Sequence, residues 1–333
     1  MKLLVTGGAG YIGATTVRSL LADGHDVAVY DNLSKGHSEA VPSDVPLIHA
    51  DIADRHKLEL TFQEYQPEAV LHFAAFIEAG ESMQMPEKYF RNNSAGTLTL
   101  LETMLAMGVA KLIFSSTAAL YGEPDQVPVE ETAALNPTNA YGESKLLIER
   151  MLSWFGRIHR LRYASLRYFN AAGSDGHSGE QHQPESHLIP LVLQAAAGTR
   201  NAISIFGTDY PTPDGTCIRD YIHVSDLARA HLLALYALSQ HEQLIYNVGN
   251  GRGFSVRDVI DSARRVTGCA IHAVEGERRA GDPAVLVASS EKIRHELGWV
   301  PQHPELDSIV ASAWQWMRRH PTGYACRTAD RGQ

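Results

Sequence analysis

A tyrosine and a lysine four residues apart, Tyr141 and Lys145, are the side chains of this sequence best suited to proton chemistry. At this spacing two residues lie on one face of a helix, one turn from each other. A free tyrosine has a pKa near ~10, but an ammonium group beside it favours the phenolate and lowers that pKa. The pair can then take a proton from an alcohol and later return it. A solvated helix face has the same spacing, so the interpretation depends on the elements that would position the pair.

The N-terminus combines a predicted strand, a glycine-rich turn and a predicted helix. An apolar strand over residues 3–5 is followed by glycines at positions 7, 10 and 13, and a helical pattern continues through Leu21. Gly7, Gly10 and Gly13 allow a tight turn, close backbone approach to a pyrophosphate, and packing of the helix on the strand. The helix N-terminus then presents free N–H groups to phosphates. This arrangement is the context that a dinucleotide-binding turn requires.

An acid follows the second predicted strand, where dinucleotide-binding folds place one. The strand over residues 26–30 ends in Asp31-Asn32, and a carboxylate there can bond the adenosine ribose hydroxyls. It would repel the 2′-phosphate of NADP, so NAD is the predicted cofactor. A third strand over residues 47–50 ends at Asp51, which either accepts from the adenine amino group or caps the helix beginning near Asp54.

The next elements bring hydroxyl groups and small residues to the same edge of the sheet. A fourth strand over residues 69–75 ends in small side chains, which let a cofactor lie close to the backbone. A fifth strand over 111–114 runs into Ser115-Ser116-Thr117, where a hydroxyl points into the crevice beyond the strand ends. A long helical segment, about 84–107, contains Asn92-Asn93, poor helix formers that indicate a buried polar role.

Strands that alternate with helices predict an α/β fold with a Rossmann-type, doubly wound parallel sheet. The helix starting near Pro137 and a sixth strand over 162–167 complete this pattern. Residues 171–187, rich in Gly, Ser, His and Gln, predict a long loop of the kind found in lids and domain junctions. We therefore predict an NAD-binding domain over 1–178, with segments near 219–250 returning to it, and a smaller α/β substrate domain over 179–333. The later elements are expected as strands over 203–206, 221–224 and 244–248 and helices over 225–239, 255–267 and 305–319.

Composition limits the classes of partner. The 38 acidic and 29 basic residues give a formal net charge of −9, which argues against a broad nucleic-acid or anionic membrane surface. No run of 18 or more apolar residues occurs, and the N-terminal apolar run is too short for a signal-peptide core. Three separated cysteines, Cys217, Cys269 and Cys326, form no disulfide framework and fit a reducing cytoplasm. The last residues, 327–333, predict a loose polar tail.

Three histidines five residues apart, His177, His182 and His187, raise the question of a metal site. Their spacing suits no helix face, and no cysteine or acid completes a ligand set in the sequence. We therefore expect a loop here and no metal.

Several of these motifs together resemble the extended short-chain dehydrogenase/reductase family. They are the glycine turn over residues 6–13, the hydroxyl segment 115–117, and Tyr141 with Lys145. More narrowly, the segments 31–33, 166–170, 207–212, 214–216, 219–224 and 278–282 resemble the UDP-glucose 4-epimerase branch of that family. The resemblance runs in order from residue 2 to about residue 323.

The resemblance implies an NAD-dependent isomerase that interconverts UDP-galactose and UDP-glucose through a 4-keto intermediate, with transient hydride transfer to bound NAD. Tyr141 would take the proton of the sugar 4-OH, and Thr117 would share the hydrogen bond to that oxygen. Lys145 would hold the nicotinamide ribose and lower the Tyr141 pKa. It further implies a homodimer formed through the long helices near 84–107 and 137–157.

The resemblance also implies two sets of binding residues, which overlap at the catalytic tyrosine. For NAD they are Gly7, Gly10, Tyr11, Ile12, Gly13, Asp31, Asn32, Leu33, Ser34, Gly36, Asp51, Ile52, Phe73, Ala74, Ala75, Asn92, Ser115, Tyr141, Lys145, Tyr168 and Phe169. For the UDP-sugar they are Thr117, Tyr141, Asn170, His187, Leu188, Ser204, Ile205, Phe206, Arg219, Tyr221, Arg279, Asp282 and Leu286.

Three positions depart from the pattern of some relatives. Ile77 stands where some members carry Lys, and His187 replaces an Asn that can also donate to a substrate oxygen. Leu286 occupies a position that is Tyr in strictly hexose-specific members. Because Leu is smaller, we hypothesise that the sugar pocket also admits an N-acetyl group.

Rival functions differ in the chemistry they need. Sugar-nucleotide 4,6-dehydratases and decarboxylases place acids just after the active Ser/Thr, whereas Thr117 is followed here by Ala118-Ala119, so both are disfavoured. A UDP-glucuronate 4-epimerase shares the chemistry at C4 and stays open. A catalytically silent NAD- or nucleotide-sugar-binding protein would not need Thr117, Tyr141 and Lys145.

Overall fold

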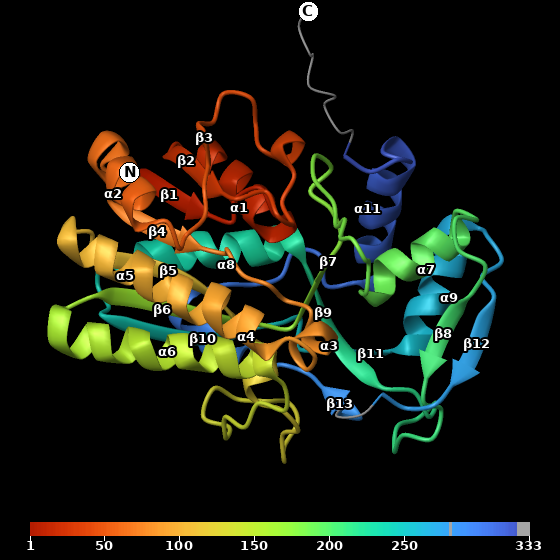
Figure 1. Cartoon of the computed structure of the whole chain (residues 1–333). Helices are drawn as coiled ribbons and strands as arrows, with labels where there is room; N and C mark the ends of the chain where they lie inside the picture. Colours follow the sequence, from red (N-terminus) through yellow and green to blue (C-terminus); the bar gives the residue numbers. More distant parts are fainter. Residues whose placement is uncertain (280–281, 325–333) are drawn as a thin grey trace, which may run out of the picture.

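A seven-stranded parallel sheet forms the centre of the larger part of the molecule (Figure 1). The computed structural model describes residues 1–279 and 282–324, so Cys326 and the predicted tail 327–333 lie outside the described residues. The strand order β10-β6-β5-β4-β1-β2-β3 confirms the predicted doubly wound sheet. The order reverses between β1 and β4, which is where such sheets bind ligands. The strands are β1 Lys2–Thr6, β2 Asp26–Asp31, β3 Leu47–His49, β4 Ala69–His72, β5 Lys111–Thr117, β6 Arg162–Tyr168 and β10 Gln243–Val248.

Helices cover both faces of this sheet, which explains why its strands are continuous apolar runs. Along β1, Leu3 and Val5 join one core with α1 and α8, whereas Leu4 joins a second core with α2, α5 and α6. Figure 1 shows α5 and α6 side by side on their face of the sheet. The helices are α1 Tyr11–Ala22, α2 Arg55–Tyr65, α5 Gly96–Ala106, α6 Ala140–His159 and α8 Val224–Ala237.

The remaining chain builds smaller sheets and a third core beside the carboxyl ends of the main sheet. β9 pairs with β7, β11 and β13, and β8 pairs with β12; α7, α9 and α11 pack around them. Of the segment 219–250, β10 joins the main sheet, α8 packs on its face, and most of β9 lies in the second sheet. These elements are β7 Asn170–Ala172, α7 Leu188–Ala196, β8 Ile203–Phe206, β9 Ile218–His223, β11 Gly253–Ser255, α9 Val256–Thr267, β12 Ala273–Gly276, β13 Val285–Leu286, α10 Glu291–Leu297 and α11 Leu306–Arg319.

The structure defines the start of one predicted helix and the helix types within another. The helix that carries Tyr141 and Lys145 begins at Ala140 rather than at Pro137, because the Asn139 side chain caps it by accepting from the Gly142 N–H at 2.9 Å. The segment predicted as helical over about 84–107 is helical over 86–106, but it is not α-helical throughout. It runs from α4 Pro86–Tyr89 through a π-helix, Phe90–Ala95, into α5, and a short α3 Ala79–Ser82 precedes it.

Other predicted ends shifted by a few residues, and two short helices were missed. β9 begins three residues earlier than the predicted strand, and α7 and α10 were not foreseen. Among the residues the structure describes, Cys217 and Cys269 are free thiols. None of the described helices is both long enough and apolar enough to cross a membrane.

Candidate active site

The glycine turn after β1 lies against the end of β4 so closely that no side chain fits between them. Gly7 has a φ of +73°, and a Cβ there would lie 2.4 Å from the Ala74 nitrogen. A Cβ on Gly13 would lie 2.2 Å from the Gly7 carbonyl oxygen. The turn therefore keeps its backbone exposed to a neighbouring cavity, as the binding of a pyrophosphate requires.

Asp31 holds the neighbouring loop in place at the end of β2. Its Oδ2 accepts from the Ala9 N–H at 3.0 Å and its Oδ1 from the Leu33 N–H at 2.8 Å. Each carboxylate oxygen keeps a further lone pair for a ribose hydroxyl. The alternative cap role of Asp51 was wrong, because Asp54 caps α2 by accepting from the Lys57 N–H. Asp51 instead accepts from Asn32 Nδ2 at 2.8 Å.

Most residues predicted to bind the dinucleotide line two adjoining cavities along this edge of the sheet. The first holds Gly7, Gly10, Asp31, Asn32, Ser34, Gly36, Ile52, Phe73, Ala74, Ala75 and Asn92. The second holds Tyr11, Ile12, Gly13, Ser115, Thr117, Tyr141, Tyr168, Phe169, Asn170, His187 and Leu286, again with Gly7, Gly10, Phe73 and Ala75. Leu33, Asp51 and Lys145 line neither of them.

Two hydroxyl groups, those of Thr117 and Tyr141, meet in the second cavity. Thr117 ends β5, and Tyr141 lies in the first turn of α6, so one sheet strand and one helix bring them together. Lys145 lies one turn further along α6 and is buried, with its Nζ donating to the Ser115 carbonyl oxygen at 2.9 Å. The cavity therefore presents a phenol and an alcohol to a bound molecule, with the lysine behind them.

The predicted lowering of the Tyr141 pKa is not found in this structure. Burial raises the pKa of Tyr141 to about 12, against the opposing effect of its hydrogen bond with Thr117. Burial also lowers the pKa of Lys145 to about 7, which weakens its charge at neutral pH. A positive charge bound beside the phenol would oppose the effect of burial and favour the phenolate form of Tyr141.

A third cavity adjoins the second and carries the predicted substrate residues of the C-terminal part. It is lined by Asn170, His187, Leu188, Ser204, Phe206, Arg219, Tyr221, Arg279 and Asp282. Ile205 does not line it, because side chains alternate along β8 and Ile205 points into the third core.

Two arginines that line the third cavity, Arg219 and Arg279, contact neighbouring side chains. Arg219 pairs with Asp282, and the Arg279 guanidinium lies 4.0 Å from the centre of the Phe206 ring. Planar guanidinium groups in such a cavity suit phosphate oxygens.

Comparison with known proteins decides the family, since the chain matches the NAD dependent epimerase/dehydratase family over residues 3–249. The chain belongs to that family. It is 53% identical to the UDP-glucose 4-epimerase of Halalkalibacterium halodurans, over 99% of this chain and 100% of that protein. These matches confirm the resemblance predicted from the motifs.

Solved structures of the same family agree closely with the fold. A UDP-glucose-4-epimerase from Stenotrophomonas maltophila with bound NAD and formylated UDP-arabinopyranose superposes with a TM-score of 0.93 at 39% identity, covering 97% of this chain and 99% of that one. The UDP-Glc/GlcNAc 4-epimerase from Campylobacter jejuni superposes with a TM-score of 0.85 at 43% identity, covering 96% and 99%.

This epimerase/dehydratase family member also has a buried polar residue at the site whose partners the sequence did not reveal. Asn93, fully buried in the π-helix, accepts from the Phe76 N–H at 2.9 Å and donates to the Phe76 carbonyl at 3.0 Å and to Ser144 Oγ at 3.0 Å. It ties the wall of the dinucleotide cavity to the catalytic helix. The paired asparagines did indicate a buried polar role, and Asn93 is the buried member of the pair, whereas Asn92 lines the cavity.

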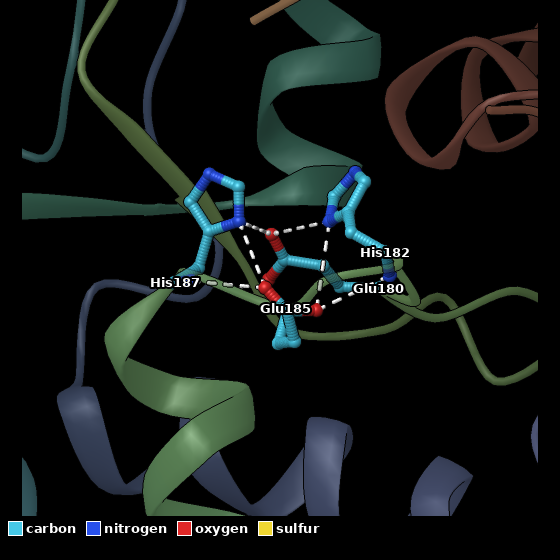
Figure 2. A group of neighbouring side chains, drawn as sticks. All are labelled: Glu180, His182, Glu185 and His187. Carbon is cyan, nitrogen blue, oxygen red and sulfur yellow. Dashed lines mark hydrogen bonds and ion pairs between the residues drawn. The ribbon is translucent and has the colours of Figure 1, made fainter. Parts of the chain in front are cut away.

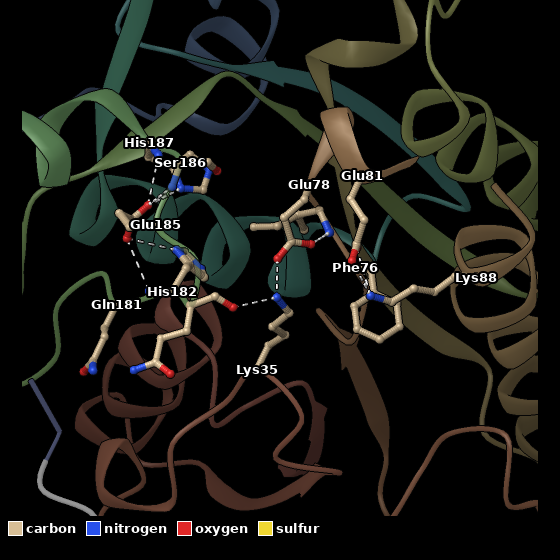
Figure 3. Close-up of polar contacts among 12 residues, drawn as sticks. Lys35, Phe76, Glu78, Glu81, Lys88, Gln181, His182, Glu185, Ser186 and His187 are labelled. Carbon is tan, nitrogen blue, oxygen red and sulfur yellow. Dashed lines mark hydrogen bonds and ion pairs between the residues drawn. The ribbon is translucent and has the colours of Figure 1, made fainter. Parts of the chain in front are cut away.

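A lysine and a glutamate from separate loops also meet at the cavity. Lys35 Nζ lies 2.6 Å from Glu78 Oε1 and donates to the Gln183 carbonyl at 3.3 Å. Figure 3 shows Lys35 and Glu78 pointing toward each other from opposite sides. Both residues line the second cavity, and no motif in the sequence marked either of them.

One premise about the loop before α7 was wrong. The sequence appeared to offer no acid that could join the histidines, but Glu180 and Glu185 converge with His182 and His187. His177 takes no part. The loop has no periodicity, so sequence spacing could not show which side chains meet.

Proposed function

We propose that this protein is a UDP-glucose 4-epimerase, which interconverts UDP-galactose and UDP-glucose through a 4-keto sugar while NAD stays bound. The observation that carries this proposal is the meeting of Thr117 and Tyr141 in one cavity between the glycine turn and the arginine-bearing cavity. Asn170, Ala171, Glu180 and His187 line both the second and third cavities, so a nucleotide diphosphate in one reaches the hydroxyls in the other.

The residues of the dinucleotide cavities fit NAD. A backbone cradle that any Cβ would fill faces the pyrophosphate, and Asp31 faces the ribose with a charge that excludes a 2′-phosphate. NAD, when bound, accepts and returns the hydrogen of sugar C4 and brings positive charge to the nicotinamide end.

The protein's own residues would move the proton. Tyr141 accepts the proton of the sugar 4-OH once its pKa has been lowered, Thr117 shares the hydrogen bond to that oxygen, and Lys145 holds the nicotinamide ribose. Arg219 and Arg279 bind the diphosphate. Because the nucleotide is anchored far from C4, the sugar ring is free to present either face, and remote binding energy is used without fixing the reacting ring.

The direct test is proton NMR of the purified protein with UDP-galactose and no added NAD. We expect UDP-glucose to appear, which would support both the reaction and the retention of NAD through purification. If nothing turns over even with NAD supplied, the UDP-hexose assignment fails.

We also propose that the sugar pocket admits an N-acetyl group. Leu286, on the two-residue strand β13, lines the cavity that holds Tyr141 and is half-buried. The Campylobacter jejuni relative is named for both UDP-Glc and UDP-GlcNAc. We expect turnover of UDP-N-acetylgalactosamine, reduced at least tenfold by Leu286→Tyr with UDP-galactose turnover retained. Equal turnover of both substrates by the variant would exclude Leu286 as the gate.

We further propose a cytoplasmic homodimer that pairs through α5 and α6. These two helices pack against each other, and together they expose four large apolar side chains, those of Leu98, Leu105, Trp154 and Ile158. Light scattering should give twice the mass of the chain, and Trp154→Glu should shift the protein to a monomer.

We also propose the division of the chain into an NAD-binding domain over 1–178 and a smaller substrate domain over 179–333.

A further inference from the structure

Four side chains with metal-binding chemistry converge on the loop before α7. Glu180, His182, Glu185 and His187 each offer one ligand atom, and these atoms all lie within 4.8 Å of one another. Figure 2 shows both imidazole rings turned toward the two carboxylates between them. All four come from one stretch of eight residues, so a single loop conformation assembles the whole set.

The two histidines of the cluster differ in how close their Nδ1 atoms lie to the carboxylate oxygens. His187 Nδ1 lies 2.9 Å from Glu180 Oε1 and 3.1 Å from Glu185 Oε1, which are hydrogen-bond lengths. His182 Nδ1 lies 3.7 Å from Glu180 Oε1 and 3.5 Å from Glu185 Oε2, too far for good hydrogen bonds. This Nδ1 atom is buried and has no hydrogen-bond partner. A buried polar atom left in that state is costly, so the geometry leaves a role for a further group.

A metal ion fits these separations. Bonds of about 2.0–2.2 Å at tetrahedral angles place neighbouring ligand atoms about 3.3–3.6 Å apart. The four separations between a histidine nitrogen and a carboxylate oxygen run from 2.9 to 3.7 Å, and all four ligand atoms lie within 4.8 Å of one another, so side-chain shifts of up to about 1 Å would bring them to that geometry. We propose that Glu180, His182, Glu185 and His187 bind a divalent transition-metal ion, and that zinc is the ion this site takes.

The ligand set points to zinc and to a structural role. Two imidazoles with two carboxylates suit a borderline ion such as zinc better than Mg²⁺ or Ca²⁺, which prefer oxygen ligands and higher coordination numbers. Four protein ligands close a tetrahedral site and leave no position for a reacting water, so the ion would brace the loop and not perform chemistry.

The charge of the surroundings favours the same conclusion. Glu180 and Glu185 line the cavity that also holds Arg219 and Arg279, where two uncompensated carboxylates would repel an anion. A divalent ion neutralises both. Two protonated histidines would also do so, but His182 Nδ1 lacks an acceptor at hydrogen-bond distance, whereas a metal ion satisfies all four ligand atoms together.

The position of the loop over residues 173–187 indicates what a bound ion would hold in place. Arg18 pairs with Asp175 at 2.7 Å, and Tyr11 donates to the Gly173 carbonyl at 2.7 Å, so the start of the loop is fixed to α1. The stretch from 180 to 187 lies between the second and third cavities. Ligation through Nδ1 would fix the ring of His187 while its other nitrogen stays free to face a ligand.

The experiment measures metal, not turnover. Tag-free protein is stripped with a chelator, dialysed, loaded with zinc, freed of excess ion and analysed by inductively coupled plasma mass spectrometry. We expect one zinc per chain in the wild type and in His177→Gln, a matched control from the same loop whose side chain is exposed and outside the cluster. His182→Gln and Glu185→Gln should bind zinc at least ~100-fold more weakly, since loss of outer-shell partners alone costs about 10–100-fold.

A second measurement needs no variant and guards against misfolding. The stripped wild-type protein titrated with Co²⁺ should develop the intense visible bands of tetrahedral cobalt, saturating at one equivalent and lost when zinc is added. Weak octahedral bands, zinc well below one equivalent, or equal zinc content in His182→Gln and wild type would mean an adventitious ion only and would overturn the proposal. No sugar nucleotide is present, so this outcome is independent of whether the protein is an epimerase.

Discussion

The protonation state of Tyr141 is the single-residue feature on which the proposed mechanism depends. In this structure burial raises its pKa to about 12, and burial lowers the pKa of the neighbouring Lys145 to about 7, so only part of the lysine is charged at neutral pH. A cationic ring bound against Tyr141 would favour loss of its proton. This coupling would keep the base inactive until the cofactor is in place.

Replacing the phenol by a benzene ring removes the proton carrier and little else. We expect Tyr141→Phe to lower kcat by about 10²–10⁴-fold, the usual contribution of a general base, with the bound NAD retained. Steady-state turnover and the NAD content of the purified variant check this. Tyr65→Phe, remote from the cavities, is the control; a Tyr141→Phe protein within tenfold of wild type would require another base.

Lys35 is the second residue whose role can be tested alone. It joins the loop after β2 to Glu78 and to the Gln183 carbonyl at the dinucleotide cavity. We expect Lys35→Met to speed the release of NAD by about 10–100-fold, because a charge-assisted contact of about 1.5–3 kcal/mol is lost. Rapid filtration of protein loaded with radiolabelled NAD, after dilution into unlabelled NAD, measures this rate. The exposed Lys57→Met should leave it unchanged, and equal rates for both variants would remove Lys35 from the binding site.

Among the elements, the π-helix Phe90–Ala95 has the clearest link to function. A π-turn inserts an extra residue in a helix and re-aims its side chains, and such turns are frequent at functional sites. Here it carries Asn93 to Phe76 and Ser144, so the cavity wall and the catalytic helix share one buried amide. The element therefore positions Tyr141 through α6.

Removing this amide should cost stability as well as alignment. Asn93→Leu leaves the Phe76 N–H and carbonyl without their partner and removes the donor to Ser144 Oγ, so we expect a loss of about 2–4 kcal/mol in the free energy of unfolding. Urea unfolding measures it. The exposed Asn201, which takes no part in these contacts, gives the control variant Asn201→Leu, whose cost should stay below about 1 kcal/mol. Similar losses for both would mean that the contacts of Asn93 are not special.

Across the whole molecule, buried neutral histidines make the fold sensitive to acid. Burial lowers the pKa of His72 to about 3 and the pKa values of His223 and His231 to about 4, whereas an unfolded histidine titrates near ~6.5. Between these values the unfolded chain binds more protons than the folded one. Their stabilisation is therefore complete above about pH 6.5 and is lost as the pH falls towards 4 and below.

Each such histidine should contribute a slope of up to about 1.4 kcal/mol per pH unit. We expect His231→Gln to reduce the pH dependence of unfolding between pH 4.5 and 6.5 by up to this amount, whatever its effect on absolute stability. Chemical denaturation at several pH values checks the slope. The exposed His177→Gln should run parallel to the wild type, and a parallel curve for His231→Gln would show that this residue titrates alike in both states.

The sequence by itself determined the elements whose signals are local. Apolar strand runs, the glycine turn, Asp31 at a strand end, and Tyr141 with Lys145 on one helix follow from neighbouring residues, so the doubly wound sheet and the core of the candidate site could be predicted. Only the tertiary structure decided the rest. It brought Lys35 to Glu78 and Asn93 to Ser144, two contacts between residues far apart in the chain. It also buried Ile205 in the third core and brought Glu180 next to His182 through irregular backbone. The protonation of Tyr141 likewise depends on burial, which no local pattern encodes, because desolvation is set by everything packed around a group.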